Sequence, residues 1–175
     1  HAIVALFRIG DDISDAIPLE DVVPKTGCAV RILQASSGEG EIQFVAEGVQ
    51  RVEIINWLTD KPPYLVEVRY MENDQAESET EIKAYAMALI GALKELLPIN
   101  PLYSEELKHY MNRFSPNDPS PLADLAAAIT TASAEELQEV LDTSLLIPRM
   151  KKSLAILKKE IEVAKLQTQI REEVN

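Results

Sequence analysis

The spacing of apolar residues divides the chain into a β part and a helical part. Up to about residue 75, apolar and polar side chains alternate with the two-residue period of strands. This period predicts strands at Ala2–Phe7, Cys28–Gln34, Ile42–Ala46, Val49–Leu58 and Tyr64–Met71. Several short strands with turns between them are typical of a small barrel or sandwich.

Two connections in the β part carry turn signals. The segment Ser36–Gly40 is predicted to be a hairpin turn, because glycine adopts positive φ at little cost. The acidic segment 11–21 is predicted to be a loop and not a helix, because it contains Pro18 and is followed by Pro24. Both faces of the first strand are apolar, so we expect both faces to be covered.

After the polar stretch Glu72–Glu79 the apolar period changes to that of helices. The sequence Ser78-Glu-Thr-Glu81 is a capping box, which predicts a helix that ends at Pro98. Further helices are predicted from Ser104, from Ser120-Pro121 and from a second capping box, Ser133-Ala-Glu-Glu136. Because these four segments are short and closely spaced, we expect a compact bundle.

The last segment predicts one long helix. No glycine or proline interrupts the roughly 27 residues after Pro148, which is enough for a helix on the order of 40 Å long. Its first half is expected to pack on the bundle through Leu154, Leu157 and Ile161. The stripe of Leu166, Ile170 and Val174 is expected to project toward a partner helix. These patterns divide the chain into a β-barrel subdomain at 1–75, a helical bundle at 76–144 and a connecting helix at 145–175.

The charge of the chain limits its partners. The net charge is −12, from 17 Lys and Arg against 29 Asp and Glu. Segments 1–75 and 76–144 hold 13 and 12 acids against 6 and 4 bases, whereas 145–175 holds 4 acids and 7 bases. An acidic surface repels phosphate backbones, so a nucleic-acid partner is disfavoured. The positive last segment is suited to an acidic surface, on the body of the protein or on another molecule.

The single cysteine, Cys28, excludes an internal disulfide and favours a reducing compartment, so we expect a cytoplasmic protein. Its place on the apolar face of a strand predicts a buried thiol. The sequence contains no run of about eighteen apolar residues, so no membrane-spanning helix and no membrane partner is predicted.

The sequence offers no catalytic, metal or nucleotide site. The glycine pair Gly38-Glu-Gly40 lacks a following Lys-Ser/Thr and a helix start, so it is a hairpin turn and not a phosphate loop. The histidines, His1 and His109, are isolated from each other and from other metal ligands. The acidic pairs of the helical part lie in predicted first turns, where the helix dipole favours them. No Gly-x-Ser-x-Gly elbow occurs.

Two sets of residues carry a resemblance to a known family. One is Gly27 followed by the hairpin and then Glu47, Gly48, Arg51 and Ile54. The other consists of residues at the spacing of a long-helix signature: Arg149, Leu154, Leu157, Glu160 and Ile161. The chain resembles the amino-terminal domain of the ATP-dependent Lon protease. The strand and helix that open this domain in the family are not found, so we expect the chain to begin part-way into the domain, with one edge of the barrel open.

The resemblance implies an α+β fold, a PUA-like β-barrel followed by a helical bundle and a long helix that leads to an ATPase. It implies a non-catalytic role in recognising unfolded or damaged polypeptides and in assembly with the ATPase domain and sister subunits. ATP and magnesium, a Walker ATPase and a Ser-Lys dyad would then belong to the parent protein. Two alternatives stay open: a free-standing adaptor or small-ligand module of the same fold, and an enzyme with an unrecognised site in the barrel.

Trp57, Pro62, Tyr64 and Leu65 are the candidate polypeptide-binding residues. They form an aromatic and proline-rich corner, and rigid amphipathic side chains suit a peptide-binding surface. The alternative is that Trp57 and Tyr64 seal a seam between the barrel and the helices. Among the residues of the resemblance, Gly48 is expected to form a bend and Arg51 to pair with an acid or a carbonyl.

Overall fold

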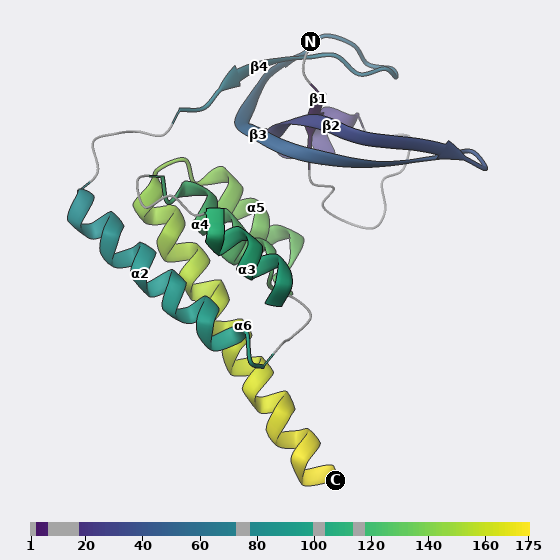
Figure 1. Ribbon diagram of the computed structural model, residues 1–175. Coiled ribbons are helices and arrows are strands. Elements are labelled where there is room, and N and C mark those ends of the chain that lie inside the picture. Colours follow the sequence, from purple (N-terminus) through teal and green to yellow (C-terminus); the bar gives the residue numbers. More distant parts are fainter. Residues whose placement is uncertain (1–2, 7–17, 73–77, 100–103, 114–117) are drawn as a thin grey trace. The chain divides into compact units, whose positions relative to one another are not determined.

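Apart from one helical turn at Leu19–Val22, the strands come first along the chain and the helices follow (Figure 1), so the predicted α+β class and β-then-α order are confirmed. The computed structural model describes residues 3–6, 18–72, 78–99, 104–113 and 118–175. The chain forms two compact units, His1–Glu72 and Asn73–Asn175. Each unit has its own buried apolar residues.

The β unit contains an antiparallel sheet in which neighbours along the chain are also neighbours in space. Its strands are β1 (Ile3–Ala5), β2 (Thr26–Gly38), β3 (Glu41–Trp57) and β4 (Val66–Tyr70). Their order in the sheet is β1-β2-β3-β4. The buried apolar residues Ala29, Val52 and Ile54 lie on the two central strands. The half-buried Val66 and Val68 of β4 follow the predicted alternation.

β3 differs from the prediction of two separate strands with a break at Gly48. It is one strand of 17 residues, and Gly48 pairs with Val30 inside it. The register between β2 and β3 shifts between Ala29 and Val30 and again between Ile32 and Gln34. Bulges of this kind let a long strand bend without ending, because the extra residue takes up the change of direction.

The hairpin turn is tighter than predicted. Gly38 pairs with Glu41, which leaves a two-residue turn whose φ angles are +50° at Glu39 and +85° at Gly40. Positive φ at both central positions is the geometry that matches the twist of the flanking strands. Glycine therefore supplies one of the two positions, and glutamate takes the other at a cost of about 1 kcal/mol.

Two smaller expectations about the start of the chain are wrong. Leu19–Val22 forms one helical turn, α1. Pro18 is tolerated at its N-cap, because proline has no N–H that would need an acceptor, and the Pro18 carbonyl accepts from Asp21 N at 3.0 Å. The rest of the predicted acidic loop, up to residue 17, lies outside the described residues. The first strand is not covered on both faces, since Ile3 is 56% exposed.

The helical unit contains five helices among the residues described. They are α2 (Glu79–Leu96), α3 (Ser104–Arg113), α4 (Ser120–Ala128), α5 (Ala134–Asp142) and α6 (Leu146–Val174). Ser78 Oγ accepts from Glu81 N at 3.4 Å at the start of α2. The predicted capping box of α5 is complete, because Ser133 and Glu136 bond each other's backbone N–H. Pro148 lies in the first turn of α6, where proline is tolerated.

The core of the helical unit lies between α2, α4 and α6. The buried apolar residues that form it include Leu89, Leu93, Leu96, Leu122, Ala126, Met150, Leu157 and Ile161. Leu154 packs against this cluster, so the predicted packing of the first half of α6 is confirmed.

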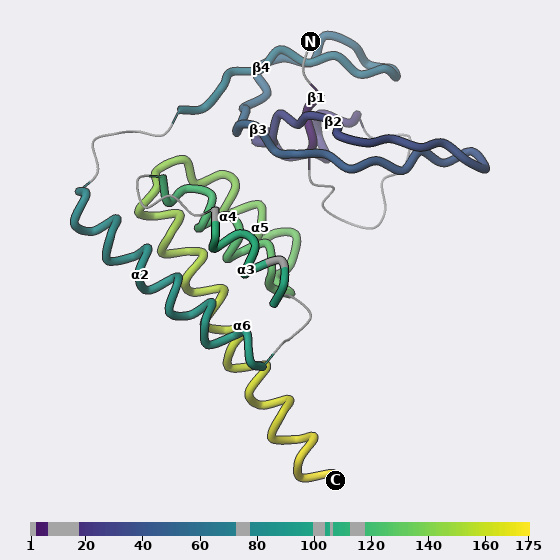
Figure 2. The backbone as a smooth tube through the Cα atoms, in the orientation of Figure 1, coloured from purple at the N-terminus to yellow at the C-terminus, as the bar shows by residue number. Residues whose placement is uncertain are grey.

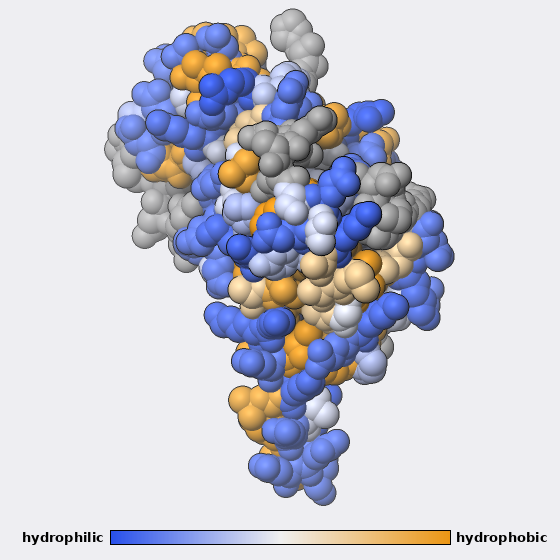
Figure 3. Space-filling view, turned by 90° about the vertical axis from the view of Figure 1, so that its left-hand side faces the viewer, coloured by the Kyte–Doolittle hydropathy of each residue, from blue (hydrophilic) through white to orange (hydrophobic). Residues whose placement is uncertain are grey.

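Beyond Ala164 every residue of α6 is exposed. Its apolar members there are Leu166, Ile170 and Val174. Figure 3 shows apolar side chains among polar ones on the part of α6 that extends past the other helices. The predicted projection of this stripe from the bundle is therefore confirmed.

Candidate functional site

The predicted binding corner is the loop that joins β3 to β4. β3 ends at Trp57 and β4 begins at Val66, so the loop carries Pro62, Tyr64 and Leu65 back alongside the end of β3. The ring centroids of Trp57 and Tyr64 lie 6.0 Å apart with an interplanar angle of 84°. This edge-to-face arrangement is one that aromatic pairs prefer. The structure therefore brings the two aromatic candidates into contact.

Hydrogen bonds fix the shape of this loop. Leu58 N donates to the carbonyl of Leu65 at 2.8 Å. Leu65 N donates to Thr59 Oγ1 at 2.9 Å, and this hydroxyl donates to the carbonyl of Pro63 at 3.3 Å. The Pro62–Pro63 peptide bond is cis. Sequence reasoning missed Thr59, because a hydroxyl that bonds a backbone six residues later leaves no periodic signal.

The corner presents apolar surface. Tyr64 and Leu65 are 43% and 50% exposed, Pro62 is also exposed, and Trp57 is half-buried. Leu58, which was not among the predicted residues, is exposed beside them. The sequence could have indicated it, because it is the apolar last residue of the predicted strand Val49–Leu58. These side chains can bind apolar groups, and none of them is a general base or a nucleophile.

Gly27 lies where β1 crosses close to β2. A Cβ at this position would lie 2.5 Å from Leu6 Cδ2 and 2.6 Å from the carbonyl oxygen of Ala5. A Cβ atom does not come within 3.0 Å of a heavy atom to which it is not bonded, so only glycine fits without displacing β1. The residue is thus required by close approach of a neighbouring strand.

Gly48 and Arg51 lie on β3 opposite the cysteine strand. A Cβ on Gly48 would come 3.2 Å from Cys28 Sγ, and Arg51 pairs with Cys28 in the sheet. The carbonyl of Arg51 accepts from Met71 N at 3.0 Å, and the expected pairing of its guanidinium stays a prediction. Cys28 is only half-buried, and its thiol donates to the carbonyl of Ala29 at 3.3 Å.

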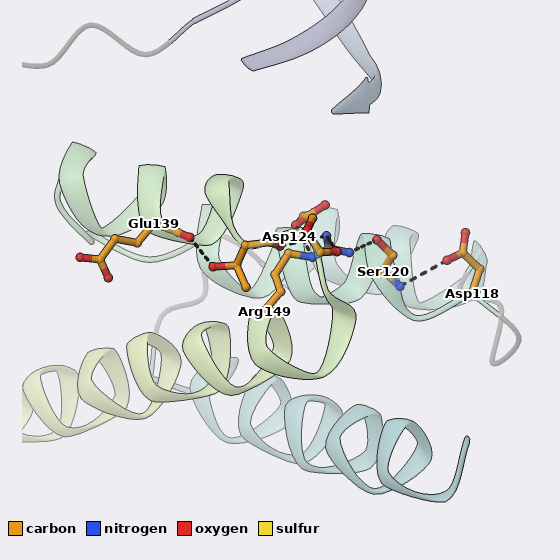
Figure 4. A network of polar contacts seen from close by, with 7 residues as sticks. Asp118, Ser120, Asp124, Glu139 and Arg149 are labelled. Carbon is orange, nitrogen blue, oxygen red and sulfur yellow. Dashed lines mark hydrogen bonds and ion pairs between the residues drawn. The ribbon is translucent and has the colours of Figure 1, made fainter. Parts of the chain in front are cut away.

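Arg149 is fully buried at the start of α6 (Figure 4). Its guanidinium donates to the carbonyls of Thr143 and Ser144 at 3.4 and 3.3 Å and to the hydroxyl of Ser120 in a short hydrogen bond. Its Nε lies 3.5 Å from Asp124 Oδ1, an ion-pair distance that is long for a hydrogen bond. Arg149 therefore joins α6 to α4 and to the α5–α6 connection.

Glu160 makes a second attachment of α6. Its Oε2 accepts from Thr131 Oγ1 at 2.8 Å, and Thr131 belongs to the connection between α4 and α5. Further along, Lys165 forms an exposed ion pair with Glu95 of α2. The two charged residues of the long-helix signature, Arg149 and Glu160, thus hold the long helix to its bundle.

Tyr110 and His109 are ionisable residues of α3 in the helical unit. Burial raises the pKa of Tyr110 to about 12, and the carboxylates of Asp118 and Asp124 add to the rise. Its phenol is therefore neutral at physiological pH and packs beside the core. His109, on the same helix, is exposed. The residues described contain no group of three or more His, Cys, Asp and Glu that could hold a metal ion.

None of the helices in the described ranges is long and apolar enough to cross a membrane.

Comparison with sequence families matches the chain over most of its length. A family model described as the ATP-dependent protease La (LON) substrate-binding domain covers residues 2–159. The chain is 46% identical over 174 residues to Lon protease 2 of Hydrogenovibrio crunogenus, which covers 99% of this chain and 20% of that protein. It is 33% identical over 118 residues to the mitochondrial Lon protease homolog of Mus musculus, 66% of this chain and 12% of that protein.

The chain spans about a fifth of the length of the bacterial relatives that it matches over nearly its whole length. The matched region is the substrate-binding domain, without the ATPase and protease domains.

Two solved structures share the fold. The N-terminal domain of the Mycobacterium avium complex Lon protease has a TM-score of 0.63 at 24% identity, with 90% of each chain covered. A Lon N-terminal domain protein from Xanthomonas campestris has a TM-score of 0.51 at 18% identity, with 78% of this chain and 70% of that chain covered. At these identities the likeness supports the fold alone.

Proposed function

The chain belongs to the family of Lon substrate-binding domains, and from this we propose that it recognises unfolded or damaged polypeptides and delivers them to the ATPase ring of a Lon-type protease. The parent would be a cytoplasmic homo-oligomer that binds ATP and magnesium outside this chain. The function of this segment is then binding and positioning, with no bond made or broken by its own residues.

The observation that carries the proposal is the corner between β3 and β4. Trp57 and Tyr64 hold each other edge to face, while Tyr64 and Leu65 keep about half of their surface exposed. Because the backbone of the loop is fixed by the Thr59 hydroxyl, little loop entropy is lost when a ligand packs on it. Rigid aromatic residues of this kind are frequent centres of binding energy.

An apolar corner of this size binds weakly and with little sequence preference. Dissociation constants in the micromolar range or weaker, about 8 kcal/mol or less, are expected for it alone. Weak binding suffices for delivery, because linkage to an ATPase raises the effective concentration of a held polypeptide at the pore. A tighter site would slow release.

Replacing Trp57 or Tyr64 by alanine is expected to weaken binding of an unfolded polypeptide about tenfold, because each change removes one ring of the pair. Fluorescence anisotropy of a labelled, permanently unfolded protein, titrated with the 175-residue chain, measures this. Tyr70→Ala is the matched control, since Tyr70 is a tyrosine on β4 with similar exposure, 49% against 43% for Tyr64.

Equal affinity of folded Trp57→Ala, Tyr64→Ala and wild-type chains would remove the corner from the binding site. If those variants also unfold at lower denaturant than Tyr70→Ala, the contact between the two rings serves the stability of the β unit. Absence of binding by the wild-type chain would remove the proposed function itself.

We also propose that α6 connects recognition to assembly. Its last part carries Leu166, Ile170 and Val174 on the surface, a stripe narrow enough for a partner helix and too narrow for a domain core. The net positive charge of segment 145–175 lies before this last part, since residues 165–175 hold two bases and two acids, so an acidic partner surface would lie beside the first part of the helix.

Hydrogen exchange on the isolated chain at low concentration tests this role of α6. Amides after about Ala164 are expected to exchange at least tenfold faster than those at 154–161, because only the latter are held by the buried Leu157 and Ile161. Uniformly strong protection to the end of the helix would contradict it. Protection that grows with protein concentration would show the stripe pairing with another molecule.

A further inference from the structure

β2 and β3 extend past the other strands as a two-stranded ribbon (Figure 2), here defined as Arg31–Gly38 with Glu41–Gly48. β1 pairs with β2 only at Cys28–Val30, and β4 pairs with β3 only at Val52–Trp57. In the part of the chain that the structure describes, no further strand pairs with the ribbon. Among the described residues, both outer edges of the ribbon are therefore open.

The ribbon carries large apolar side chains on its surface. Ile42 and Phe44 are 72% and 59% exposed. They are two residues apart on β3, so they share one face of the ribbon. Opposite them on β2 lie Ser37 and Ala35, which are too small to cover them.

The phase of the hairpin gives the direction of the backbone groups at these two residues. In a two-residue hairpin the residues that flank the turn, here Gly38 and Glu41, exchange hydrogen bonds. Along an antiparallel pair, such residues alternate with residues whose N–H and C=O point away from the partner strand. Ile42 and Phe44 are in this second class. The residues with the exposed apolar side chains are thus also the ones that offer backbone donors and acceptors at the outer edge of β3.

This edge lacks two of the usual protections against strand pairing. Lysine and proline often block exposed edges, and the ribbon has neither; the run Ile42–Ala46 is also uncharged. The ribbon does carry acids close to this run, at Glu39, Glu41 and Glu47, against one base, Arg31. A strand with basic residues is therefore favoured beside it over an acidic one.

We propose that the outer edge of β3 at Ile42–Phe44 binds an extended polypeptide segment by strand addition, with preference for segments that combine apolar and basic residues. Only an extended backbone can pair with the N–H and C=O groups of Ile42 and Phe44, while its apolar side chains cover theirs. The inference rests on the proposed function and names the class of polypeptide segment that it takes. The edge of β3 would bind through backbone hydrogen bonds, whereas the corner between β3 and β4 would bind through its side chains.

Binding of a fluorescein-labelled ten-residue peptide of alternating valine and lysine to the full chain tests the proposal. Phe44→Pro removes one outward N–H and one apolar side chain, and proline is tolerated at strand edges. We expect it to weaken peptide binding at least tenfold. The matched control is Ala35→Pro, because Ala35 pairs with Phe44 and its N–H and C=O face the opposite edge of the same ribbon. The affinity of the Ala35→Pro variant for the peptide is expected to stay within about twofold of wild type.

A second measurement does not depend on how the variants fold. The same peptide with methyl groups on alternate backbone nitrogens keeps its side chains but cannot pair along one edge. We expect the wild-type chain to bind it at least tenfold more weakly than the parent peptide. A peptide with glutamate in place of lysine should also bind more weakly.

Equal binding of the parent and methylated peptides would overturn the inference, as would equal losses in Phe44→Pro and Ala35→Pro. Dimerisation of the wild-type chain that the peptide fails to reverse would overturn it in favour of a second copy at the edge. If Phe44→Pro loses the peptide but binds unfolded protein through Trp57 and Tyr64, both proposals stand. If wild type binds unfolded protein but not the peptide, the edge proposal alone fails.

Discussion

Replacing Arg149 by leucine is expected to lower the unfolding free energy of the helical unit by about 3–5 kcal/mol. The substitution leaves the Ser120 hydroxyl and the carbonyls of Thr143 and Ser144 without the donor that they share, and it removes the cation beside Asp124. Buried groups that lose their partner carry the full cost of desolvation. Leucine also fills less volume than the buried arginine.

Urea unfolding followed by circular dichroism at 222 nm measures this loss, because the helices of this unit dominate the signal. Lys152→Ala is the control. Lys152 pairs with Glu139 on the surface of the same unit at 3.6 Å, and such exposed pairs contribute at most about 1 kcal/mol. Similar midpoints for the two variants would show that Arg149 is not the attachment that the structure indicates.

Gly27→Ala is expected to cost the β unit about 1–3 kcal/mol and to displace β1. The new methyl group would overlap Leu6 and the backbone of Ala5, and a backbone carbonyl cannot move aside as the end of a flexible side chain can. Separation of β1 from β2 should follow, since they pair only through Ile3–Ala5.

Unfolding of the β unit can be followed by the fluorescence of Trp57, the single tryptophan of the chain. Gly38→Ala is the control, because a Cβ at Gly38 has no heavy atom within 4 Å. Faster hydrogen exchange at Ile3–Ala5 should accompany Gly27→Ala alone. If both alanine variants melt like wild type, close approach is not the reason for glycine at position 27.

Local signals in the sequence predicted the helices well. Ser78, Ser133 and Pro98 act at helix ends through atoms within four residues, so their effect does not depend on the rest of the fold. The family resemblance was also confirmed. The prediction of a strand break at Gly48 was wrong, because the effect of a glycine in a strand depends on the partner strand. Gly48 lies opposite Val30 and beside a bulge, and there the strand continues through it.

Contacts between distant residues could not be predicted. Ser120 and Arg149 are 29 residues apart, and Thr131 and Glu160 are also 29 apart. No periodicity or spacing in the sequence indicates that Ser120 or Thr131 is the partner of a charged residue on the last helix. For the candidate site, the sequence indicated Trp57, Pro62, Tyr64 and Leu65, whereas the hydroxyl of Thr59 and the open edge of the ribbon depend on how the strands pair.

The way in which α6 is attached gives it a definite response to mechanical load. About nine residues, or roughly 14 Å of helix, extend past Lys165, which forms the exposed ion pair with Glu95. A sideways force on Val174 would therefore act on this pair first, and an exposed ion pair contributes only about 1 kcal/mol or less of stabilisation. The buried Ile161 comes next along the helix, followed by Glu160, Leu157 and Arg149, so resistance to the force rises toward the buried end. The exposed end of α6 would therefore move away from α2 before the core of the bundle is disrupted.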